Sequence, residues 1–552
     1  MSGRHAGFYA CQSPAIVVLL LIIIIMMTML VLVLLLSLPL FLSFLLLSFF
    51  ATVLLVFFYD GRSVATSKEM DAPHRGFPPG QASRGSRTTL FWGPLLVPLM
   101  IGCTVGPNYK RPSIDVPGMS QQQSSVAPAK PIPSTVSLGD EKWWEVFQDK
   151  ELQNLIRTAL KNNYDVRIAA TRVLQAQAQL GITRADQLPS LSVGGSETNQ
   201  NSPAAGPLPA YETTLGQVTA SAAWNLDFWG TYRRATEAAR ATLLADEWAR
   251  KQVVTTLVAN VATDYFQLRA LDFQLDISKR TLASRQDSLQ LTQIKEQHGL
   301  ATLLDVRQAE QLVDTAQTTT TDLERQITQQ ENNLSILLGN NPGDIPRGLL
   351  LTEQPHAPEV PVGIPSFLLE RRPDVRQAEE NLIAANAQIG VARAQYFPQI
   401  SLTADAGFQS SALDSLFTGP AGLWSMAGSF TQPIFQGGRL KNNVKLAEAQ
   451  KEQLLLTYQQ TIQGAFRDVS NALVGYRKDR DFRIEQEQLV AAAKDAAQLS
   501  ELRFRAGKTD YLEVLTNETN AFSAELNLAQ AKGNELLALV QLYQSLGGGW
   551  QE

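Results

Sequence analysis

Two runs of the chain that contain no proline constrain its fold more than any other feature. Each run is 68 residues long and is bounded by a glycine on both sides. A single α-helix of that length extends about 100 Å at 1.5 Å per residue. The bounding glycines are 69 residues apart in both cases: Gly230 and Gly299, then Gly438 and Gly507. The sequence therefore predicts two very long helices of equal length, each ending in a tight turn.

A shorter stretch that precedes each run occurs twice. Residues 165–189 and 374–398 are identical at eleven of twenty-five positions when aligned with a shift of 209. A period of this size indicates two copies of one large unit, not a solenoid of small repeats. Each copy continues with two alternating segments, the long run and a shorter helical run. We therefore expect two fused repeats, 140–345 and 346–552, each built as strand, loop, strand, long helix, turn and helix.

Four segments alternate between apolar and polar residues, as half-buried strands do. Three are clear, Val218–Phe228, Ile400–Phe408 and Trp424–Thr431, and a weaker one begins at Leu191. A soluble sandwich shows the same alternation, but segments of about ten residues also suit tilted membrane strands. Because four strands cannot close on themselves, a membrane barrel would have to be shared between subunits. The loops that join the strands in pairs are rich in Pro, Gly, Ser and Asn and span residues 199–210 and 410–421.

The first long run carries apolar residues three, four or seven positions apart, as the seam of a coiled coil does. Its remaining surface is rich in Gln, Arg, Asp, Thr and Ser, so we expect this helix to lie in water. Two shorter helices, 301–338 and 509–546, are expected to return along the long ones, and each pair must find other pairs to cover its apolar surface. The seam residues are Val254, Leu257, Val261, Tyr265, Leu268, Leu271, Leu275, Leu282 and Leu289.

Two hydrophobic segments precede the repeats. Residues 15–59 carry no charge and exceed the roughly 20 residues that a membrane helix needs. Residues 70–102 combine basic residues with an apolar run, as an export signal does. The Cys103 that follows makes this segment resemble a lipoprotein signal, whose cysteine becomes the lipidated N-terminus. We interpret residues 1–69 as the product of an upstream start codon, and a membrane-spanning extension is the alternative.

The segment between the signal and the repeats has a different composition. Residues 103–139 are rich in Pro, Ser and Gln without an apolar period, which predicts an extended tether behind the lipid anchor. Asp140–Leu160 is expected to begin a helix that continues into the first copy of the repeated stretch. Trp143 and Trp144 in this helix could form a ligand platform, but packing of the segment against the body is the favoured interpretation.

Composition argues against several classes of function. A net charge of −5 without a basic stripe speaks against nucleic acid as a partner. The chain has two cysteines, Cys11 and Cys103, and four histidines without ligand spacing, so neither a disulfide framework nor a metal site is predicted. No Ser/His/Asp set, phosphate loop or pair of carboxylates occurs at motif spacing, and we expect neither catalysis nor a cofactor.

A series of motifs in fixed order runs from Cys103 to Trp550. They are residues 103–112 (CTVGPNYKRP), Trp143–Trp144, residues 371–375 (RRPDV), 394–398 (AQYFP) and 547–550 (GGGW). In this order they resemble the outer-membrane efflux lipoproteins of the NodT/OprM type, which are relatives of TolC. Residues 1–69 lie outside the resemblance.

The resemblance implies a mixed α and β membrane protein with a TolC-like fold. It implies a homotrimer in which twelve strands, four per subunit, form one barrel in the outer membrane, while the long coiled-coil helices form a periplasmic tunnel. A lipid anchor at Cys103 would hold the chain to the outer membrane. The expected partners are a periplasmic adaptor (membrane fusion protein) and an inner-membrane pump of the resistance-nodulation-division (RND) type.

The turns between paired helices resemble the adaptor-docking tips and the periplasmic gate of this family. The resemblance places the gate at Leu512 and Thr516, with Glu513 nearby. OprM-type members have an aspartate where Thr516 stands, so either Asp510 or Glu513 replaces its charge or the gate is mainly apolar. The alternative is that both turns are merely capped helix ends. The residues implied in docking are Gly299, Thr302, Leu303, Asp305, Val306, Gly507 and Asp510.

Apolar residues surround both turns, and we expect them to be exposed for a partner. They are Leu300, Leu303, Leu304 and Val306 at the first turn and Tyr511, Leu512 and Val514 at the second.

These features favour a passive exit duct for small molecules such as drugs, without chemistry of its own. A TolC-like duct for type I protein secretion is the rival within the transport class. A lipid-anchored periplasmic coiled-coil scaffold is the rival from another class, and the alternating strands argue against it because a scaffold has no use for them. A wide polar tunnel selects little, so the sequence leaves the cargo open.

Overall fold

The structure is a computed structural model of the chain. It describes residues 104–113, 142–204, 206–207, 209–355 and 371–550, which all belong to one compact unit, Phe91–Glu552. The expectations for residues 1–69, for the export signal, for Cys103 and for most of the tether therefore lie outside the described residues. In the described part of the chain, no helix is both long and apolar enough to cross a membrane.

The described elements follow the predicted order in each half of the chain. The long helices α6 and α10 both contain 67 residues, and the returning helices α7 and α11 both contain 35. The first half consists of α3 (Trp143–Val146), α4 (Lys150–Asn162), α5 (Tyr164–Ala185), β1 (Ser190–Ser202), β2 (Tyr211–Leu226), α6 (Thr231–Gln297) and α7 (Leu303–Leu337). The second consists of α9 (Pro373–Ala394), β3 (Gln399–Ser410), the short helices η5 (Leu413–Ser415) and η6 (Gly419–Ala421), β4 (Gly422–Thr431), α10 (Arg439–Arg505) and α11 (Tyr511–Ser545).

The four strands form one antiparallel sheet in the order β1-β2-β3-β4. Residues directly opposite each other on antiparallel strands share a face. One row across the sheet is apolar: Val193, Ala220, Ala406 and Trp424. The next row, on the opposite face, is polar: Ser192, Ser221, Asp405 and Ser425. The predicted alternation is therefore continuous across all four strands and produces one apolar and one polar face.

The first two strands are longer than the sequence predicts. β1 continues to Ser202 through the start of the expected loop, and β2 begins at Tyr211 instead of Val218. In the added part of β2 the apolar face continues with Glu212, Thr214 and Gly216. Alternation is lost there, and backbone pairing with β1 alone maintains the strand. The apolar band consequently covers only the part of the sheet nearest the helices.

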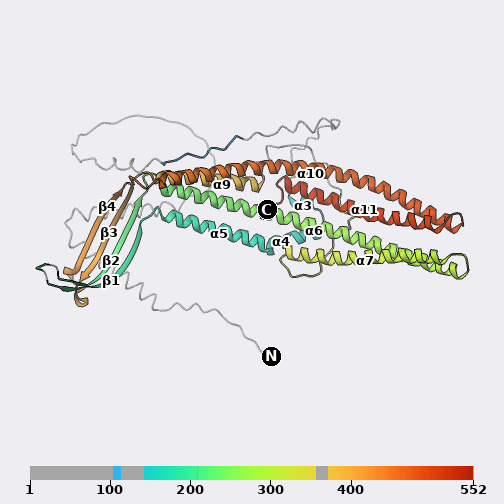
Figure 1. The fold of residues 1–552 in the computed structure, drawn as a ribbon, viewed down its shortest axis with the longest axis horizontal. Coiled ribbons are helices and arrows are strands. Elements are labelled where there is room, and N and C mark those ends of the chain that lie inside the picture. Colours follow the sequence, from blue (N-terminus) through green and yellow to red (C-terminus); the bar gives the residue numbers. More distant parts are fainter. Residues whose placement is uncertain (1–103, 114–141, 205, 208, 356–370, 551–552) are drawn as a thin grey trace, which may run out of the picture. The chain divides into compact units, whose positions relative to one another are not determined.

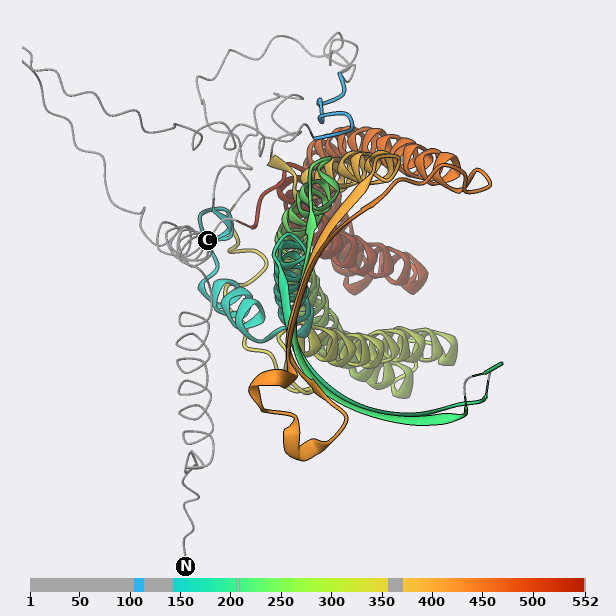
Figure 2. The ribbon, with the colours of Figure 1, turned by 90° about the vertical axis from the view of Figure 1, so that its left-hand side faces the viewer.

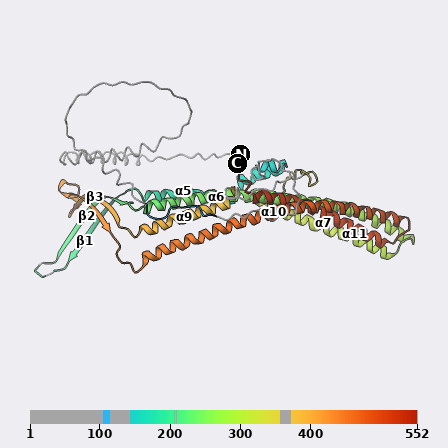
Figure 3. The ribbon, with the colours of Figure 1, turned by 90° about the horizontal axis from the view of Figure 1, so that it is seen from above.

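The strands lie at one end of this unit and the turns between paired helices lie at the other (Figure 1). Next to the sheet the helices pack side by side in the order α5, α6, α9 and α10. Figure 3 shows α5, α6 and α9 as neighbours in this layer. Further from the sheet α7 returns along α6, while α11 packs against both α10 and α6. Figure 2, seen from the sheet end, shows that the sheet is strongly curved and has one hollow side.

The main hydrophobic core lies where α3 and α4 meet the middle of the long helices. Trp143 is buried in this core, which confirms that the N-terminal segment packs against the body. The predicted continuous helix from Asp140 into the repeat is wrong, because the chain breaks after Val146 and again at Asn163. The side chains of Asp149 and Asn163 accept hydrogen bonds from the first N–H groups of α4 and α5, and such N-caps start a new helix.

The two copies of the repeated stretch, α5 and α9, are buried to different extents. α9 lies between α6 and α10 and buries eleven residues, whereas α5 packs mainly against α6 and buries only Ala169 and Leu180. A Cβ on Gly390 of α9 would lie 2.9 Å from the carbonyl oxygen of Val105, whereas its counterpart Gly181 in α5 faces open space. Position in the bundle, not sequence identity, decides their burial.

The described N-terminal peptide, residues 104–113, lies along α6 and α9. The N–H of Val105 donates to the carbonyl of Trp229 at 3.0 Å, and Asn386 donates to the carbonyl of Pro107 at 2.8 Å. Arg111 forms an ion pair with Glu379 at 2.9 Å. The peptide therefore starts at the junction between β2 and α6 and follows α9 away from the sheet.

Gly407→Ala should destabilise the sheet, whereas Gly194→Ala should be tolerated. A Cβ at Gly407 would lie 2.0 Å from the carbonyl oxygen of Val218 and 2.7 Å from the Cα of Thr219, so β2 and β3 would have to separate. Overpacking of this kind costs roughly 1–3 kcal/mol. At Gly194 no heavy atom lies within 4 Å of the added carbon. Guanidinium unfolding in detergent, followed by circular dichroism, should show a lower midpoint for Gly407→Ala alone; equal midpoints would contradict the strand register.

Candidate functional site

The two turns predicted as tips lie together at the end of the helices that is remote from the sheet (Figure 1). Gly299 and Gly507 have φ angles of +71° and +65°, in the left-handed region that glycine tolerates best. The N–H of Leu300 donates to the carbonyl of Lys295 at 2.8 Å, and Lys508 donates to Arg503 in the same way at 2.9 Å. Such bonds are typical of a Schellman motif, so the glycine spacing located two equivalent turns.

The first turn is fixed by a reciprocal cap at the start of α7. The N–H of Asp305 donates to Oγ1 of Thr302 at 3.2 Å, and the N–H of Thr302 donates to the Asp305 carboxylate at 2.7 Å. This arrangement is a capping box, which satisfies two N–H groups that the helix cannot. Thr302 and Asp305 therefore have a structural role in the turn, whatever else they contact.

The second turn is held in a different way. Asp510 is the N-cap residue of α11, but its side chain makes no capping hydrogen bond. Glu513 instead accepts a hydrogen bond from Thr509 and forms an ion pair with Arg503 of α10 at 3.3 Å. Glu513 thereby ties α10 to α11, which leaves Asp510 as the acidic side chain of this turn without a structural partner in the cap.

The two helical hairpins contact each other beside the turns. Tyr511 and Val514 of α11 are buried against Ala309 of α7. Phe504 of α10 packs on Tyr511 with 5.2 Å between ring centroids, and Lys295 of α6 lies 4.4 Å from the centroid of Phe504. Burial raises the pKa of Tyr511 to about 12. These contacts place Gly299 and Gly507 at the same end of the molecule, as the glycine spacing predicts.

Only some of the apolar residues at the turns are exposed. The expected exposure of Val306, Tyr511 and Val514 is wrong, since these side chains are 7, 5 and 2 % exposed and pack in the interior of the hairpins. Thr516 follows one helical turn after Leu512 and donates to its carbonyl at 2.8 Å. The apolar surface of the tips is therefore smaller than predicted and consists of leucines that are 59–78 % exposed: Leu300, Leu303, Leu304 and Leu512.

The tip half of α6 contains buried polar residues that the sequence analysis did not single out. Ser278, Arg285 and Thr292 are buried and lie seven residues apart, each three positions after a leucine of the seam. Ser278 shares a hydrogen bond with Thr320 of α7 at 2.8 Å. The seven-residue spacing of these three polar residues is present in the sequence. A pattern of apolar residues alone does not include them. Toward the tips, α6 and α7 are therefore joined by alternating apolar and polar contacts.

Arg285 is the buried charge in this seam. Its Nη1 donates to the carbonyl of Leu312 at 2.9 Å, and its guanidinium lies 4.8 Å from the ring centroid of Phe522 on α11. Its Nε and Nη2 have no hydrogen-bond partner among the described residues. Burial lowers the pKa of Arg285, while the nearby Glu518 opposes that shift. A guanidinium with so few partners costs free energy, so this contact between the two hairpins is less favourable than one in which every donor is satisfied.

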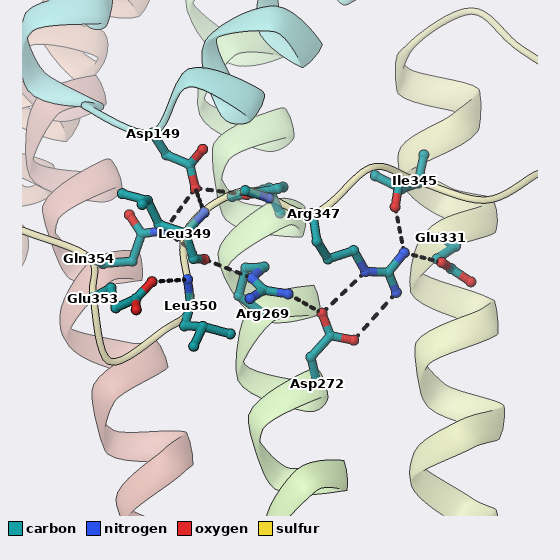
Figure 4. A network of polar contacts seen from close by, with 12 residues as sticks. Asp149, Arg269, Asp272, Glu331, Ile345, Arg347, Leu349, Leu350, Glu353 and Gln354 are labelled. Carbon is teal, nitrogen blue, oxygen red and sulfur yellow. Dashed lines mark hydrogen bonds and ion pairs between the residues drawn. The ribbon is translucent and has the colours of Figure 1, made fainter.

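A buried polar network joins α4, the middle of α6 and the segment after α7 (Figure 4). The buried carboxylate of Asp149 accepts from Tyr265 at 2.8 Å, from the N–H of Leu349 at 3.0 Å and from Gln354 at 2.9 Å. Burial and this carboxylate together raise the pKa of Tyr265. Hydrogen bonds to an ionised acceptor are stronger than neutral ones, so one side chain binds α4, α6 and the segment after α7 together.

Arg347 extends this network to α7. It forms ion pairs with Asp272 of α6, at 3.2 Å, and with Glu331 of α7. Arg269 bonds Asp272 at 2.6 Å and the carbonyl of Leu349 at 3.0 Å. The segment that follows α7 is thereby fastened across the root of the first hairpin. The sequence analysis did not find this network because Asp272 and Arg347 are 75 residues apart and Asp149 and Gln354 are 205 apart.

The chain is similar to known proteins over most of its length. A sequence profile described as "Outer membrane efflux protein" matches residues 155–340 and 364–548. The probable efflux pump outer membrane protein TtgC of Pseudomonas putida is 37% identical over 459 residues, which cover 82% of this chain and 93% of TtgC. The cation efflux system protein CusC of Escherichia coli is 33% identical over 454 residues, covering 82% and 97%. The solved open state of the Neisseria gonorrhoeae MtrE outer membrane channel matches with a TM-score of 0.74 and 31% identity, over 81% of this chain and 99% of MtrE.

The chain belongs to the outer membrane efflux protein family. Its fold is that of the TolC-like outer-membrane channels, and it is an outer-membrane component of an efflux system, as the sequence analysis expected. The family is one of efflux channels and not of enzymes. Within the ranges that the structure describes, no group of three or more His, Cys, Asp or Glu side chains is placed to hold a metal ion.

Asp149→Ala should loosen the root of the first hairpin. The change leaves Tyr265, Gln354 and the N–H of Leu349 without their acceptor in a buried site. Unsatisfied buried donors cost about 1–3 kcal/mol each, so a loss of about 3 kcal/mol is expected. Asp322→Ala on the exposed face of α7 removes a surface ion pair with Arg325 and a hydrogen bond from Gln326 and should leave the unfolding midpoint nearly unchanged, because such exposed contacts contribute little. Chemical unfolding of both variants measures the difference, and similar losses would show that the network does not stabilise the fold.

Proposed function

We propose that the chain forms, as a homotrimer, the exit duct of a tripartite efflux pump and passively conducts small molecules to the exterior. The observation that carries this proposal is the four-stranded sheet, which has two unpaired edges and one apolar face. Three such sheets supply twelve strands, and a closed barrel gives the edge groups of every strand a partner. The repeats 140–345 and 346–552 would then each supply two of the four strands of a subunit.

The exposure of the strands supports a barrel in lipid. Large apolar side chains on both edge strands are 68–83 % exposed in the subunit: Leu191, Val193, Trp424, Met426 and Phe430. An apolar surface of this kind indicates a membrane or partner interface. The polar continuation of the same face in β1 and β2 suits strands that extend beyond the hydrocarbon region.

The helices next to the sheet also present two uncovered sides. α5 and α10 form the two edges of the helical layer, and their exposed apolar residues include Ile168, Leu174 and Ile182 on α5 and Leu446 and Leu456 on α10. Packing α5 of one subunit against α10 of the next would cover both edges. Three subunits joined in this way enclose a tunnel of helices that continues the barrel.

The position of Thr104 supports a lipid anchor at Cys103. A Cβ on Gly230 would lie 3.1 Å from the Cα of Thr104, so this residue lies where β2 passes into α6. Acyl chains on the preceding cysteine would therefore reach the membrane surface without a spacer. Residues 70–102 are then a signal peptide, and residues 1–69 are absent from the mature protein.

The tips are proposed as the docking site of a periplasmic adaptor and as the gate of the duct. Docking would use the exposed Leu303 with its neighbouring leucines, on a turn shaped by Gly299, Thr302, Asp305 and Val306 and matched by Gly507. The gate would use Leu512 and Thr516, with Asp510 as its charge because Glu513 pairs with Arg503. An RND pump in the inner membrane would drive transport through the adaptor.

The relatives support a small-molecule cargo. A TtgC protein of Pseudomonas putida is named a toluene efflux pump component, and CusC belongs to a cation efflux system. Similar ducts in systems with such different cargo indicate that selection occurs in the pump. A duct for type I protein secretion is the second candidate, and the efflux names of the relatives favour the first.

Phe430→Asp should prevent assembly, whereas Ser429→Asp should be tolerated. Phe430 lies on the apolar face of β4, and a carboxylate in lipid costs on the order of a few kcal/mol, depending on depth. Ser429 lies on the polar face and shares a hydrogen bond with Ser401. Trimers in isolated outer membranes, detected on gels without heating, measure the outcome. If the two variants behave identically, the assignment of the apolar face to lipid is wrong.

Leu303→Asp should abolish efflux while trimers remain in the membrane, because charge disrupts an apolar contact with the adaptor. Ile336→Asp is the matched control, since Ile336 is similarly exposed (61 % against 59 %) at the other end of α7. Leu512→Ala should instead make the closed duct leaky to large antibiotics.

Drug susceptibility separates these outcomes, and single-channel conductance should rise for Leu512→Ala alone. Unchanged efflux and unchanged conductance in both tip variants would remove the tips from the mechanism.

Cleavage before Cys103 should give a mature chain that begins with an acylated cysteine. Mass spectrometry of the N-terminal peptide, compared between the natural chain and Cys103→Ala, should show the added acyl mass only in the former. A mature protein that still contains residues 1–69 would contradict both the anchor and the proposed start.

A further inference from the structure

Half of the tryptophans of the chain gather at one place outside the sheet and the tips. The chain has eight tryptophans, and four of them, Trp143, Trp144, Trp248 and Trp550, lie together. Three of them border a cavity of about 370 Å³ between α4, the start of α5, α6 and the C-terminal end. Arg157 and Arg250 line the same cavity. Its size is within the range of ligand sites.

Every indole of this cluster carries a cation on its face. Lys251 is held between Trp248 and Trp550, with 3.8 and 4.6 Å from its Nζ to the ring centroids. Lys142 lies 4.9 Å from Trp144, Arg157 lies 5.7 Å from Trp143, and Arg376 lies 5.6 Å from Trp248. Cation–π contacts hold these long side chains in place, so their charges are ordered before any ligand binds.

Most of these cations form no ion pair with a carboxylate in the part of the chain that the structure describes. Arg157 donates only to the neutral amide oxygens of Asn154, at 3.2 Å, and Gln153, at 3.4 Å. Among the residues that the structure describes, Lys142, Arg157 and Lys251 have no carboxylate at ion-pair distance. Glu379 is already paired with Arg376 and Arg111, which leaves Glu247 as the acidic group facing Lys251.

The cluster holds several cations and one carboxylate, Glu247, that faces Lys251. Burial lowers the pKa of Lys251, and the neighbouring Arg250 and Arg376 act in the same direction against Glu247. The Nε1 of Trp550 is buried without a hydrogen-bond acceptor among the described residues. The buried N–H donor of Trp550 and the cation of Arg157 both border this cavity, and Lys251 packs on the same Trp550. An anion with several oxygen atoms could accept from all three groups.

We propose that this cluster binds the carboxylate-bearing wall polymer of the periplasm and so holds the duct in the cell wall. The choice of ligand rests on the proposed function, which sets the sheet in the outer membrane. Lys251 is the twenty-first residue of α6, about 30 Å from the sheet end and about 70 Å from the tip. Lipid headgroups and a tip-bound adaptor are therefore out of reach. α4 and the C-terminal end lie on the side away from the hollow of the sheet, hence on the outside of the duct (Figure 2).

Co-sedimentation with isolated cell-wall sacculi tests the site. The purified full-length protein in detergent should be retained by sacculi at low salt, and a double variant, Arg157→Gln with Lys251→Gln, should be retained about tenfold less because two charged donors are lost. Arg157→Lys preserves the charge and should be retained nearly as well as the natural chain. Sacculi whose carboxylates have been amidated should retain neither the natural chain nor the Arg157→Lys variant.

The matched control removes one lysine and one arginine elsewhere on α6. Lys279→Gln with Arg280→Gln changes exposed residues in surface ion pairs and should leave retention unchanged. Loss of retention in this control would show that net charge, not the site, causes binding. Absent retention of the natural chain, or equal retention of the Arg157/Lys251 variant, would overturn the proposal. Sedimentation requires no pump, so absence of binding to sacculi would not contradict the proposed exit duct. Drug susceptibility tests that function separately.

Discussion

The backbone groups on the outer edges of β1 and β4 are the constraint on which the rest of this structure depends. The sheet ends at these strands, and no water is available in a membrane to satisfy unpaired N–H and C=O groups. A single subunit therefore leaves unpaired strand edges in the membrane. Contact with further strands and helices would pair these edges and cover the exposed sides of α5 and α10. In the proposed trimer, neighbouring copies would supply the missing strands and helices.

Stability is distributed unevenly along the helical hairpins. Near their root, the Asp149 network and the main core bind α4, α6, α7 and the connecting segment in one block. Further toward the tips the seam alternates leucines with Ser278, Arg285 and Thr292, and the guanidinium of Arg285 is only partly satisfied. A tightly joined root and a less satisfied contact at Arg285 would allow the two hairpins to move relative to each other at the proposed gate.

The two repeats share the lengths and order of their elements but differ in the contacts that their residues make. Helix lengths are equal in the two halves, yet α9 is buried between two helices and covered by the N-terminal peptide, while its copy α5 lies at an edge. The capping chemistry of the tips also differs, with a Thr302–Asp305 box at one and the Glu513–Arg503 pair at the other. In the proposed function, the edge helix α5 would serve assembly, while the two different tips would serve adaptor docking and closure.

Much of the fold could be predicted because its signals are local and periodic. The sequence by itself determined the helix lengths, which follow from the distance between glycines such as Gly230 and Gly299, and the sheet faces, which follow from the two-residue period of the strands. It did not determine which tip residues are exposed, since the burial of Val306 and Tyr511 depends on how the helices pack. Nor did it reveal the Asp149 network or the cation–tryptophan cluster. Only the tertiary structure decided these, because their partners are brought together by packing from positions far apart in the chain, where no local period records them.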